Sequence, residues 1–529
     1  MNHQIFFRNR VHTAAAGLLC TLWTLGALAA PPAAPVVATS ADIKQLHFDW
    51  SIVPRSNYYE FWFKANTGAP WVKFSEPPPW QPTATNNISA HLLDWDQARY
   101  QVKACNFSGC TPSPAIPVKD RMFESIGYLK ASGSYRDGRF GFTAAISEDG
   151  QTIAAFAGNE PVSGGNIASV YVFRRINGVW QQQKRIVPST TNPDVHNIGL
   201  EYFGKGTLAL SGDGNRLMIS LPVCPTPGAV CNQLLSVWLR NGSTWTREYQ
   251  QLDFDMFLSP WTVDMDEAGD RIVYRSSLLH PLRVLERTTA GWVNGAPVPA
   301  DPSDLTCSMN RLSGDGATLA RLCSPHTSSI IHLLIAKAPD WNVTRNLVLD
   351  WPRGQTYGDF AIDHAGTTVA YSTSIEVDIL DDPRQEVHVV KLANGTFSET
   401  KVRAGSWAPA EYGRFGGTIA LSRDGAYLAA YDRLDHGEGR GVLSPPLTAG
   451  ALATGAVSVF EVRDTGPRLR RVLKPNGPLR ARNVNSTLAF ANNGKTLLVS
   501  DPEDASNATG IDGDRTDTTM PGAGALWLY

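Results

Sequence analysis

The sequence predicts an all-β fold, and three observations carry that prediction. The 529-residue chain contains 46 Gly and 35 Pro, which favour turns, and its 15 Trp lie among short apolar runs typical of strands. Apolar residues make up 43% of the chain and charged residues 18%, which is enough to bury a large core. From about Phe123 to the C-terminus, one strand–turn–strand pattern recurs seven times. Together these observations predict a seven-bladed β-propeller preceded by a smaller β-sandwich.

The first 29 residues predict export. Arg8 and Arg10 precede an apolar run that ends in the small-x-small sequence Ala27-Leu28-Ala29, as in a secretory signal peptide. A retained membrane anchor is the alternative, but the run is short for a spanning helix and a proline-rich stretch follows it. We expect a secreted, periplasmic or cell-surface protein with no membrane span after cleavage.

The cysteines agree with export. Outside the predicted signal peptide, the remaining six fall into three short-range pairs, which an oxidising compartment would turn into disulfides. Zinc binding is the alternative, but no CxxC motif or suitably spaced His accompanies them. The predicted disulfides are Cys105–Cys110, Cys224–Cys231 and Cys307–Cys323.

Residues 30–120 predict the β-sandwich. Short runs of alternating apolar and polar residues, such as Leu46–Trp50 and Tyr58–Phe63, are separated by Pro and Gly clusters. The Trp50 strand, Leu93 and the later Tyr100-x-Val102-x-Ala104 pattern resemble a fibronectin type III domain. That resemblance implies that Trp50 lies in the core and that Tyr100 packs at a strand corner.

Residues 121–529 contain the repeat. Each copy is an apolar strand, a turn ending in Gly and a second apolar strand, and most copies add a third apolar strand and a more polar fourth. Four strands at this spacing are typical of a propeller blade, whose outer strand faces water. The turn glycines, 47 to 69 positions apart, are Gly150, Gly214, Gly269, Gly316, Gly366, Gly425 and Gly494.

The last repeat predicts how the ring closes. It has only three strands, and the third ends at Tyr529. The segment Ser125–Lys130 precedes the first repeat and has the character of an outer strand. Pairing the two would leave no exposed sheet edge, so we expect this segment to complete the seventh blade.

The repeats also resemble a known family. Phe140-Gly141, Phe203-Gly204 and Phe415-Gly416 stand before first strands, and with the acidic tail 501–514 they resemble the FG-GAP repeats of secreted bacterial and integrin α-type propellers. The turn motif alone is also similar to TolB-like propellers. The FG-GAP resemblance implies cell adhesion or matrix contact, with calcium as a ligand of the family.

Calcium is the one ligand that the residues themselves suggest. Asp512, Asp514 and Asp517 place three carboxylates in a Gly-containing loop, and hard oxygen ligands at alternate positions suit Ca²⁺. A solvated acidic loop is the alternative interpretation. Asp432, Asp435 and Glu438 form a second acidic loop with a weaker pattern.

The motifs name no reaction. The chain has no GxSxG or HExxH motif, and in its turns Gly follows Asp one position too early for a sialidase Asp box. A net charge of −2 offers no basic field for nucleic acid. We expect a monomeric, non-enzymatic scaffold that presents propeller loops to an extracellular protein or glycan. The alternative is a polysaccharide lyase or glycoside hydrolase acting through the central funnel, to which Arg139 and Arg414 could contribute.

Overall fold

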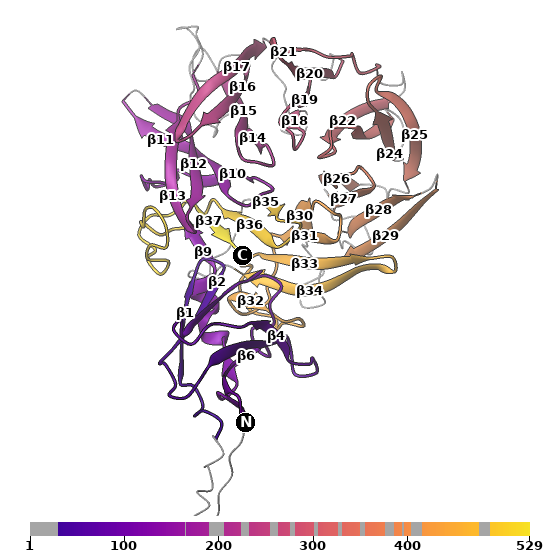
Figure 1. Cartoon of the computed structure of the whole chain (residues 1–529). Coiled ribbons are helices and arrows are strands. Elements are labelled where there is room, and N and C mark those ends of the chain that lie inside the picture. Colours follow the sequence, from indigo (N-terminus) through magenta and orange to yellow (C-terminus); the bar gives the residue numbers. More distant parts are fainter. Residues whose placement is uncertain are drawn as a thin grey trace, which may run out of the picture.

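The computed structural model is an all-β protein, in which a ring of sheets carries a smaller N-terminal module on one side (Figure 1). None of the described residues forms a helix long and apolar enough to cross a membrane. The predicted signal peptide, 1–29, lies outside the described residues, as do Cys224 and Cys231. The structure describes residues 30–163, 165–189, 206–223, 232–253, 263–275, 281–300, 305–325, 331–349, 355–375, 386–393, 396–403, 415–474 and 487–529.

The N-terminal module, residues 30–118, has two sheets. One has the order β1-β2-β5 and the other the order β4-β3-β6-β7, with β8 also paired to β6. Trp50 and Tyr100 are both buried and share a core, as expected for alternating strands with one inward face. The strands are β1 Val37–Asp42, β2 Gln45–Trp50, β3 Tyr58–Lys64, β4 Val72–Ser75, β5 Thr83–Asn87, β6 Arg99–Asn106, β7 Gly109–Pro112 and β8 Ile116–Pro117.

A short connection leads from the module to the ring. The 3₁₀ helix η1, Lys119–Arg121, runs into one turn of α-helix, α1, Met122–Ser125, and then into strand β9, Gly127–Leu129. Met122 is buried against the ring, where its Sδ accepts a hydrogen bond from the backbone N–H of Val442 at 3.4 Å. The connection is therefore packed against the ring and holds the module beside it.

The described ring strands form seven antiparallel sheets, six of four strands and one of five. The first sheet is β10 Phe140–Ile146, β11 Thr152–Val162, β12 Gly165–Ile176 and β13 Val179–Ile186. The second is β14 Thr207–Leu210, β15 Arg216–Val223, β16 Asn232–Asn241 and β17 Thr244–Asp253. The third is β18 Val263–Met265, β19 Arg271–Tyr274, β20 Arg283–Thr288 and β21 Gly291–Asn294. The fourth is β22 Leu305–Leu312, β23 Thr318–Pro325, β24 Ile331–Lys337 and β25 Asn342–Leu349.

The remaining three sheets complete the circle. The fifth is β26 Gln355–Ile362, β27 Thr368–Ile375, β28 Glu386–Ala393 and β29 Thr396–Arg403. The sixth is β30 Phe415–Leu421, β31 Tyr427–Asp432, β33 Ala456–Arg463 and β34 Gly466–Lys474, with the added strand β32 Gly441–Leu443 on its outer edge. The seventh is β35 Leu488–Ala491, β36 Thr496–Asp501, β37 Ala525–Leu528 and β9. The first strand of each sheet contacts the first strand of the next, and β35 contacts β10.

The expected ring closure is confirmed. Strand β9 pairs antiparallel with β37, with Tyr128 opposite Trp527. The Tyr128 side chain is fully buried, lies 4.6 Å from the Trp527 ring and donates a hydrogen bond to Asp504 at 2.8 Å. Lys130 reaches the same carboxylate at 3.0 Å. The N-terminal end of the ring is therefore fixed to its C-terminal sheet by both packing and charge.

The turn glycines have the conformation that the repeat requires. Gly214, for example, has a φ of +65°, and Ser211 in the same turn donates its hydroxyl to Asp213 at 2.6 Å. Backbone hydrogen bonds also join neighbouring turns: the Gly212 N–H donates to the Glu267 carbonyl at 2.7 Å, and the Glu267 N–H donates to the Gly314 carbonyl at 2.9 Å. The turns thus link the sheets at one mouth of the central channel.

The Phe-Gly pairs also have a structural role. Phe140 and Phe415 are buried, and the glycines after them have positive φ. A Cβ on Gly141 would lie 2.9 Å from the Ala525 carbonyl oxygen of the seventh sheet. Glycine is therefore required there because neighbouring sheets approach closely. Residues 203 and 204, the third predicted pair, lie outside the described residues.

The two described disulfides match the prediction. Cys105–Cys110 joins β6 to β7 in the module, and Cys307–Cys323 joins β22 to β23 in the ring. Both link directly opposed residues of neighbouring strands.

Candidate functional site

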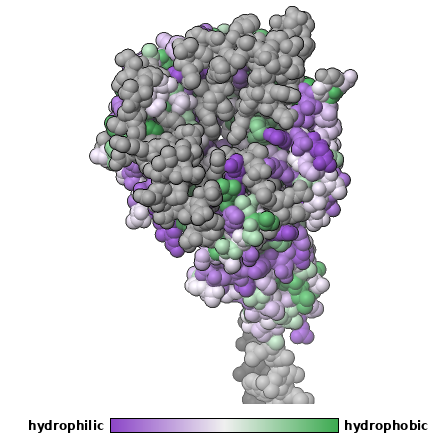
Figure 2. All heavy atoms as spheres, turned by 180° about the vertical axis from the view of Figure 1, so that it is seen from behind, coloured by the Kyte–Doolittle hydropathy of each residue, from purple (hydrophilic) through white to green (hydrophobic). Residues whose placement is uncertain are grey.

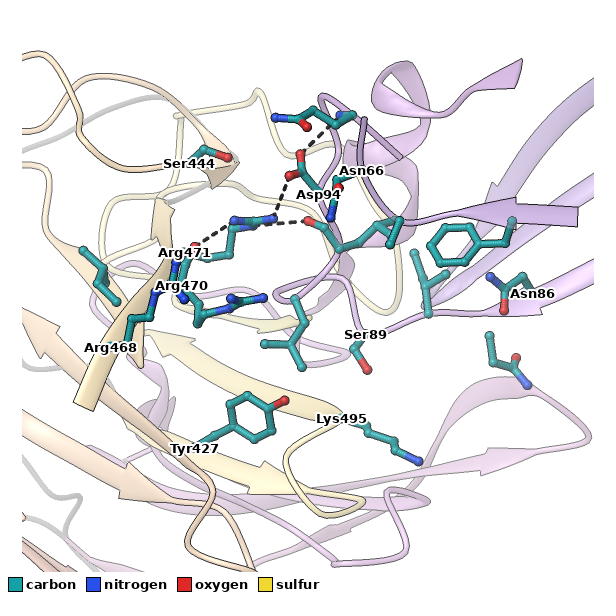
Figure 3. A pocket seen from close by; sticks show the side chains of 18 of the residues that line it. Asn66, Asn86, Ser89, Asp94, Tyr427, Ser444, Arg468, Arg470, Arg471 and Lys495 are labelled. Atoms are coloured by element: carbon teal, nitrogen blue, oxygen red, sulfur yellow. Dashed lines mark hydrogen bonds and ion pairs between the residues drawn. The ribbon is translucent and has the colours of Figure 1, made fainter. Parts of the chain in front are cut away.

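A groove of about 1200 Å³ lies between the N-terminal module and the sixth and seventh sheets (Figure 3). Module segments between 63 and 100 form one wall, strand β34 forms the other, and residues around Tyr427 and Lys495 lie between them. The groove exists because the module is held against the ring, so its shape depends on the contacts that join the two.

Buried polar contacts make that joint. The imidazole Nε2 of His91 lies 2.9 Å from the Gly494 carbonyl oxygen, and burial followed by the charge of Lys44 lowers the pKa of His91 to about 3. The Lys44 ammonium donates to the Lys495 carbonyl at 2.6 Å and also contacts Thr496. Burial, with a smaller contribution from Arg175, lowers the pKa of Lys44 to about 7.

The ring wall of the groove is basic. Strand β34 contributes Arg468, Arg470 and Arg471, and the register of β33 against β34 shifts at this point. The shift leaves Arg470 as an extra residue, which breaks the usual alternation of side chains. Arg471 lies 3.4 Å from the Asp94 carboxylate and donates to the Leu93 carbonyl at 3.3 Å, so it joins β34 to the module.

The module wall is rich in amides and hydroxyls. Asn66, Asn87 and Gln97 are exposed side-chain amides on this wall, and Ser89 lies among them. Asn86 is buried and donates its amide to the Tyr100 hydroxyl at 2.7 Å. These groups can both donate and accept hydrogen bonds.

Positive charge collects in the groove. Its lining has four cations and two carboxylates, a formal charge of +2 on a chain whose net charge is −2. Arg471 pairs with Asp94, and Asp424 accepts hydrogen bonds within its own turn from Ser422 and Ala426. The cations that can meet a ligand are therefore Arg468, Arg470 and Lys495. Arg468 and Lys495 are exposed, and the Arg470 side chain is 40% exposed.

The surface agrees with this polarity. In Figure 2, the described residues where the ring meets the module are mostly hydrophilic, with a smaller hydrophobic area beside them.

The central channel has a mixed polar and apolar lining inside the ring, which includes Arg311, 3.7 Å from Asp359. The first strands of the sheets line a space of about 340 Å³ with small and aliphatic side chains such as Ala144, Ala209 and Leu488. Asp264 and Asp359 are the carboxylates of this lining. Each accepts a backbone N–H from the next sheet, Asp264 from Leu312 and Asp359 from Ile419, both at 2.9 Å. Both carboxylates therefore tie neighbouring sheets together.

A charged cluster lies at the mouth where the turns meet. Glu267, His364 and Arg423, which we call the channel-mouth cluster, are second residues of three turns. The Glu267 carboxylate lies 2.5 Å from His364 Nδ1 and 3.0 Å from Arg423 Nε. A Cβ on Gly314 would lie 2.5 Å from His364 Nδ1, so glycine in the neighbouring turn leaves room for the cluster.

Glu148 lies at the same mouth. Its carboxylate accepts the Asn493 N–H at 2.7 Å, and burial, with a further contribution from Glu267, raises the pKa of Glu148. The mouth thus holds one carboxylate paired with Arg423 and a second with a raised pKa.

The predicted funnel arginines do not line this channel where they are described. Arg139 precedes β10 with a φ of +50°, and its backbone N–H donates to the Gly522 carbonyl at 2.8 Å. It is absent from the channel linings given by the described residues. Arg414 lies outside the described residues.

The tail loop, which contains Asp512, Asp514 and Asp517, uses its carboxylates for local hydrogen bonds. Asp512 lies 2.9 Å from Arg515 and also accepts the Tyr128 N–H. Hydrogen bonds from the Thr516 side chain and backbone lower the pKa of Asp514, and Asp517 accepts the Asn507 N–H at 3.0 Å. Calcium binding at these three residues stays a prediction.

Other candidate metal ligands have structural partners. In the second acidic loop, Asp435 lies 2.5 Å from the buried Lys474 ammonium. Among the described residues, one group of three possible ligands has its atoms within 4.8 Å of one another, namely Glu60, Cys105 and Cys110. Its two sulfurs form a disulfide and therefore offer no thiolate.

Comparison with known proteins finds structural similarity at low sequence identity. No protein-family model matches the sequence, and no curated protein sequence matches it. The structure is similar to Kuenenia stuttgartiensis hydrazine synthase, with 14% identity over 73% of this chain and 98% of that chain and a TM-score of 0.45. It is also similar to the Cps50 (Swd1) β-propeller domain of Myceliophthora thermophila, with 10% identity over 76% and 99% and the same TM-score.

A third similar structure is the periplasmic gluconolactonase of Pseudomonas aeruginosa. It shares 12% identity over 81% of this chain and 99% of that chain, with a TM-score of 0.40. The class of this chain therefore follows from its own sheets: it is all-β, and its described ring of sheets around a channel is the arrangement of a β-propeller.

Proposed function

We propose that this protein is an exported, non-enzymatic binding scaffold whose ligand occupies the groove between the module and the ring. In this proposal the module is a fibronectin type III-like sandwich and the ring a seven-bladed propeller of FG-GAP type. The groove carries the proposal, because it is open, polar and positively charged. Its two walls come from parts of the chain that Arg471 and His91 hold together.

Rigidity supports a binding role. The module and the sixth and seventh sheets share one hydrophobic core, which includes Phe48, Tyr431 and Trp527. A cleft with fixed walls loses little conformational freedom when a ligand enters, and this favours affinity.

The enzymatic alternative has one observation in its favour. At the channel mouth, Glu148 has a raised pKa while Glu267 is paired with Arg423, and a proton donor beside an ionised carboxylate is a pattern of acid–base sites. However, the Glu267 carboxylate is already engaged by both His364 and Arg423, which lowers its capacity to act as a base.

The test separates retention from turnover. The purified protein is incubated with a panel of soluble polysaccharides, and both retention on the immobilised polymer and release of new chain ends are measured. The scaffold predicts retention without new ends. New ends that disappear in Glu148→Gln and remain in the exposed control Glu124→Gln would support the enzyme and contradict the scaffold.

A further inference from the structure

We infer that the groove binds an anionic polysaccharide, a chain of sugars that carries carboxylate or sulfate groups. This inference rests on the proposed binding function and adds the chemical class of the ligand. It follows from the charge of the groove, from its hydrogen-bonding groups and from its size.

The charge comes first. Arg468 and Arg470 on β34 and Lys495, in the turn before β36, all line the groove (Figure 3). Their acidic neighbour, Glu461, lies 3.7 Å from Arg470 and also pairs with Arg463 at 2.9 Å, so it is shared between cations. Guanidinium groups bind carboxylate and sulfate oxygens through paired hydrogen bonds.

The amides and hydroxyls of the groove indicate that the ligand carries hydroxyl groups beside its acidic groups. Asn66, Asn87 and Gln97 on the module and Asn493 on the ring line the groove together with the cations. Such groups match ligand hydroxyls because each can donate and accept. Half-buried Tyr427 adds a ring surface at the floor, against which the apolar face of a sugar can pack.

The size favours a polymer. A volume of about 1200 Å³ exceeds the roughly 300–1000 Å³ of sites for drug-sized ligands. The groove is open and bounded by two walls, so a chain can pass through it. Surfaces that bind folded proteins have a more apolar core than this groove, and surfaces that bind nucleic acids have a longer row of cations.

The experiment is calorimetric titration of the full-length mature protein with four probes. They are oligogalacturonate, a sulfated dextran oligomer, neutral dextran of equal length and single-stranded DNA. The test variant is the double substitution Arg468→Gln and Arg470→Gln. The matched control is Arg136→Gln, which changes an exposed arginine that lies outside the groove lining.

We expect binding of one or both anionic polysaccharides, and the preferred probe identifies the acidic group. The double variant should bind about tenfold more weakly or worse, while Arg136→Gln changes affinity less than about twofold. Affinity should also fall as salt rises. The thermal melting temperature of each variant confirms that it is folded.

The opposing results separate the two proposals. If neutral dextran binds as tightly as the acidic polymers, or the double variant keeps its affinity, the anionic ligand is wrong while a binding groove stands. DNA binding equal to that of the polysaccharides overturns the polysaccharide assignment. If no polysaccharide binds, the inference fails, because the ligand of the groove is then not a glycan.

Discussion

The ring-closing strand gives the sharpest test of the architecture through one side chain, Tyr128. The substitution Tyr128→Ala removes a fully buried aromatic group that lies 4.6 Å from Trp527. It also removes a 2.8 Å hydrogen bond to Asp504. Truncation of a buried aromatic side chain costs about 3–5 kcal/mol. Tyr128→Phe keeps the aromatic ring of the side chain and loses only a hydrogen bond to a charged group, which costs about 1.5–3 kcal/mol of stability.

The assay combines urea unfolding with hydrogen exchange of the β9 and β37 amides. Because β9 and β37 share one sheet, Tyr128→Ala should speed exchange in both strands, although they are almost 400 positions apart. Tyr135→Ala, which removes a partly exposed tyrosine a few residues further along, is the control and should cost less than about 0.5 kcal/mol. A loss below about 1 kcal/mol for Tyr128→Ala, or unchanged exchange in β37, would refute closure by β9.

Three further predictions concern acid, calcium and disulfides. Between pH 6.5 and about 3 the unfolded chain binds a proton at His91 that the folded chain excludes, so stability should fall as pH drops through that window. In urea titrations at several pH values, His91→Phe should reduce this dependence of stability on pH. Millimolar calcium should raise the melting temperature of the wild-type protein but not of a variant with all three tail-loop aspartates changed to Asn. An unchanged melting temperature of the wild-type protein would contradict calcium binding and support the interpretation as a solvated acidic loop. Peptide mapping without reductant should find 105–110, 307–323 and 224–231, and reducing the 16-residue 307–323 link should cost about 3 kcal/mol; a long-range link would contradict the pairing.

Local patterns predicted the fold well because each repeat carries its own signal. The glycine of each turn and the apolar strands beside it reveal one unit, and the count of units follows from the chain. The closing strand was predictable for a different reason: a three-stranded last repeat and an unpaired segment before the first are complementary. The added strand β32 was not predicted, since Gly441–Leu443 is short and has no alternating pattern.

The candidate sites were harder to predict. Arg468 and Asn87 lie almost 400 positions apart, and only the docking of module on ring brings them to one groove, so no spacing along the sequence reveals it. The channel-mouth cluster had a usable signal. Aligning the seven turns places Glu267, His364 and Arg423 at the same second position, which is also that of Glu148, while two other turns have Gly there; that comparison could have located the mouth.

The tail loop shows that one pattern can serve two different uses. Alternate carboxylates at Asp512, Asp514 and Asp517 are compatible with a calcium loop, but the same residues also suit a loop that caps its own backbone N–H groups. In the structure, each of the three accepts at least one backbone hydrogen bond. Sequence alone does not separate these uses, because both need oxygen acceptors at short, regular spacing.

The central claim is that the ligand occupies the groove between module and ring. The most direct measurement is a hydrogen-exchange footprint of the full-length mature protein with and without saturating oligogalacturonate. We predict protection confined to β34 and to module residues 86–97, with no change in the turns at 147–150 and 266–269 that surround the channel mouth. Protection of those turns with β34 unchanged would place the ligand in the channel and contradict the account.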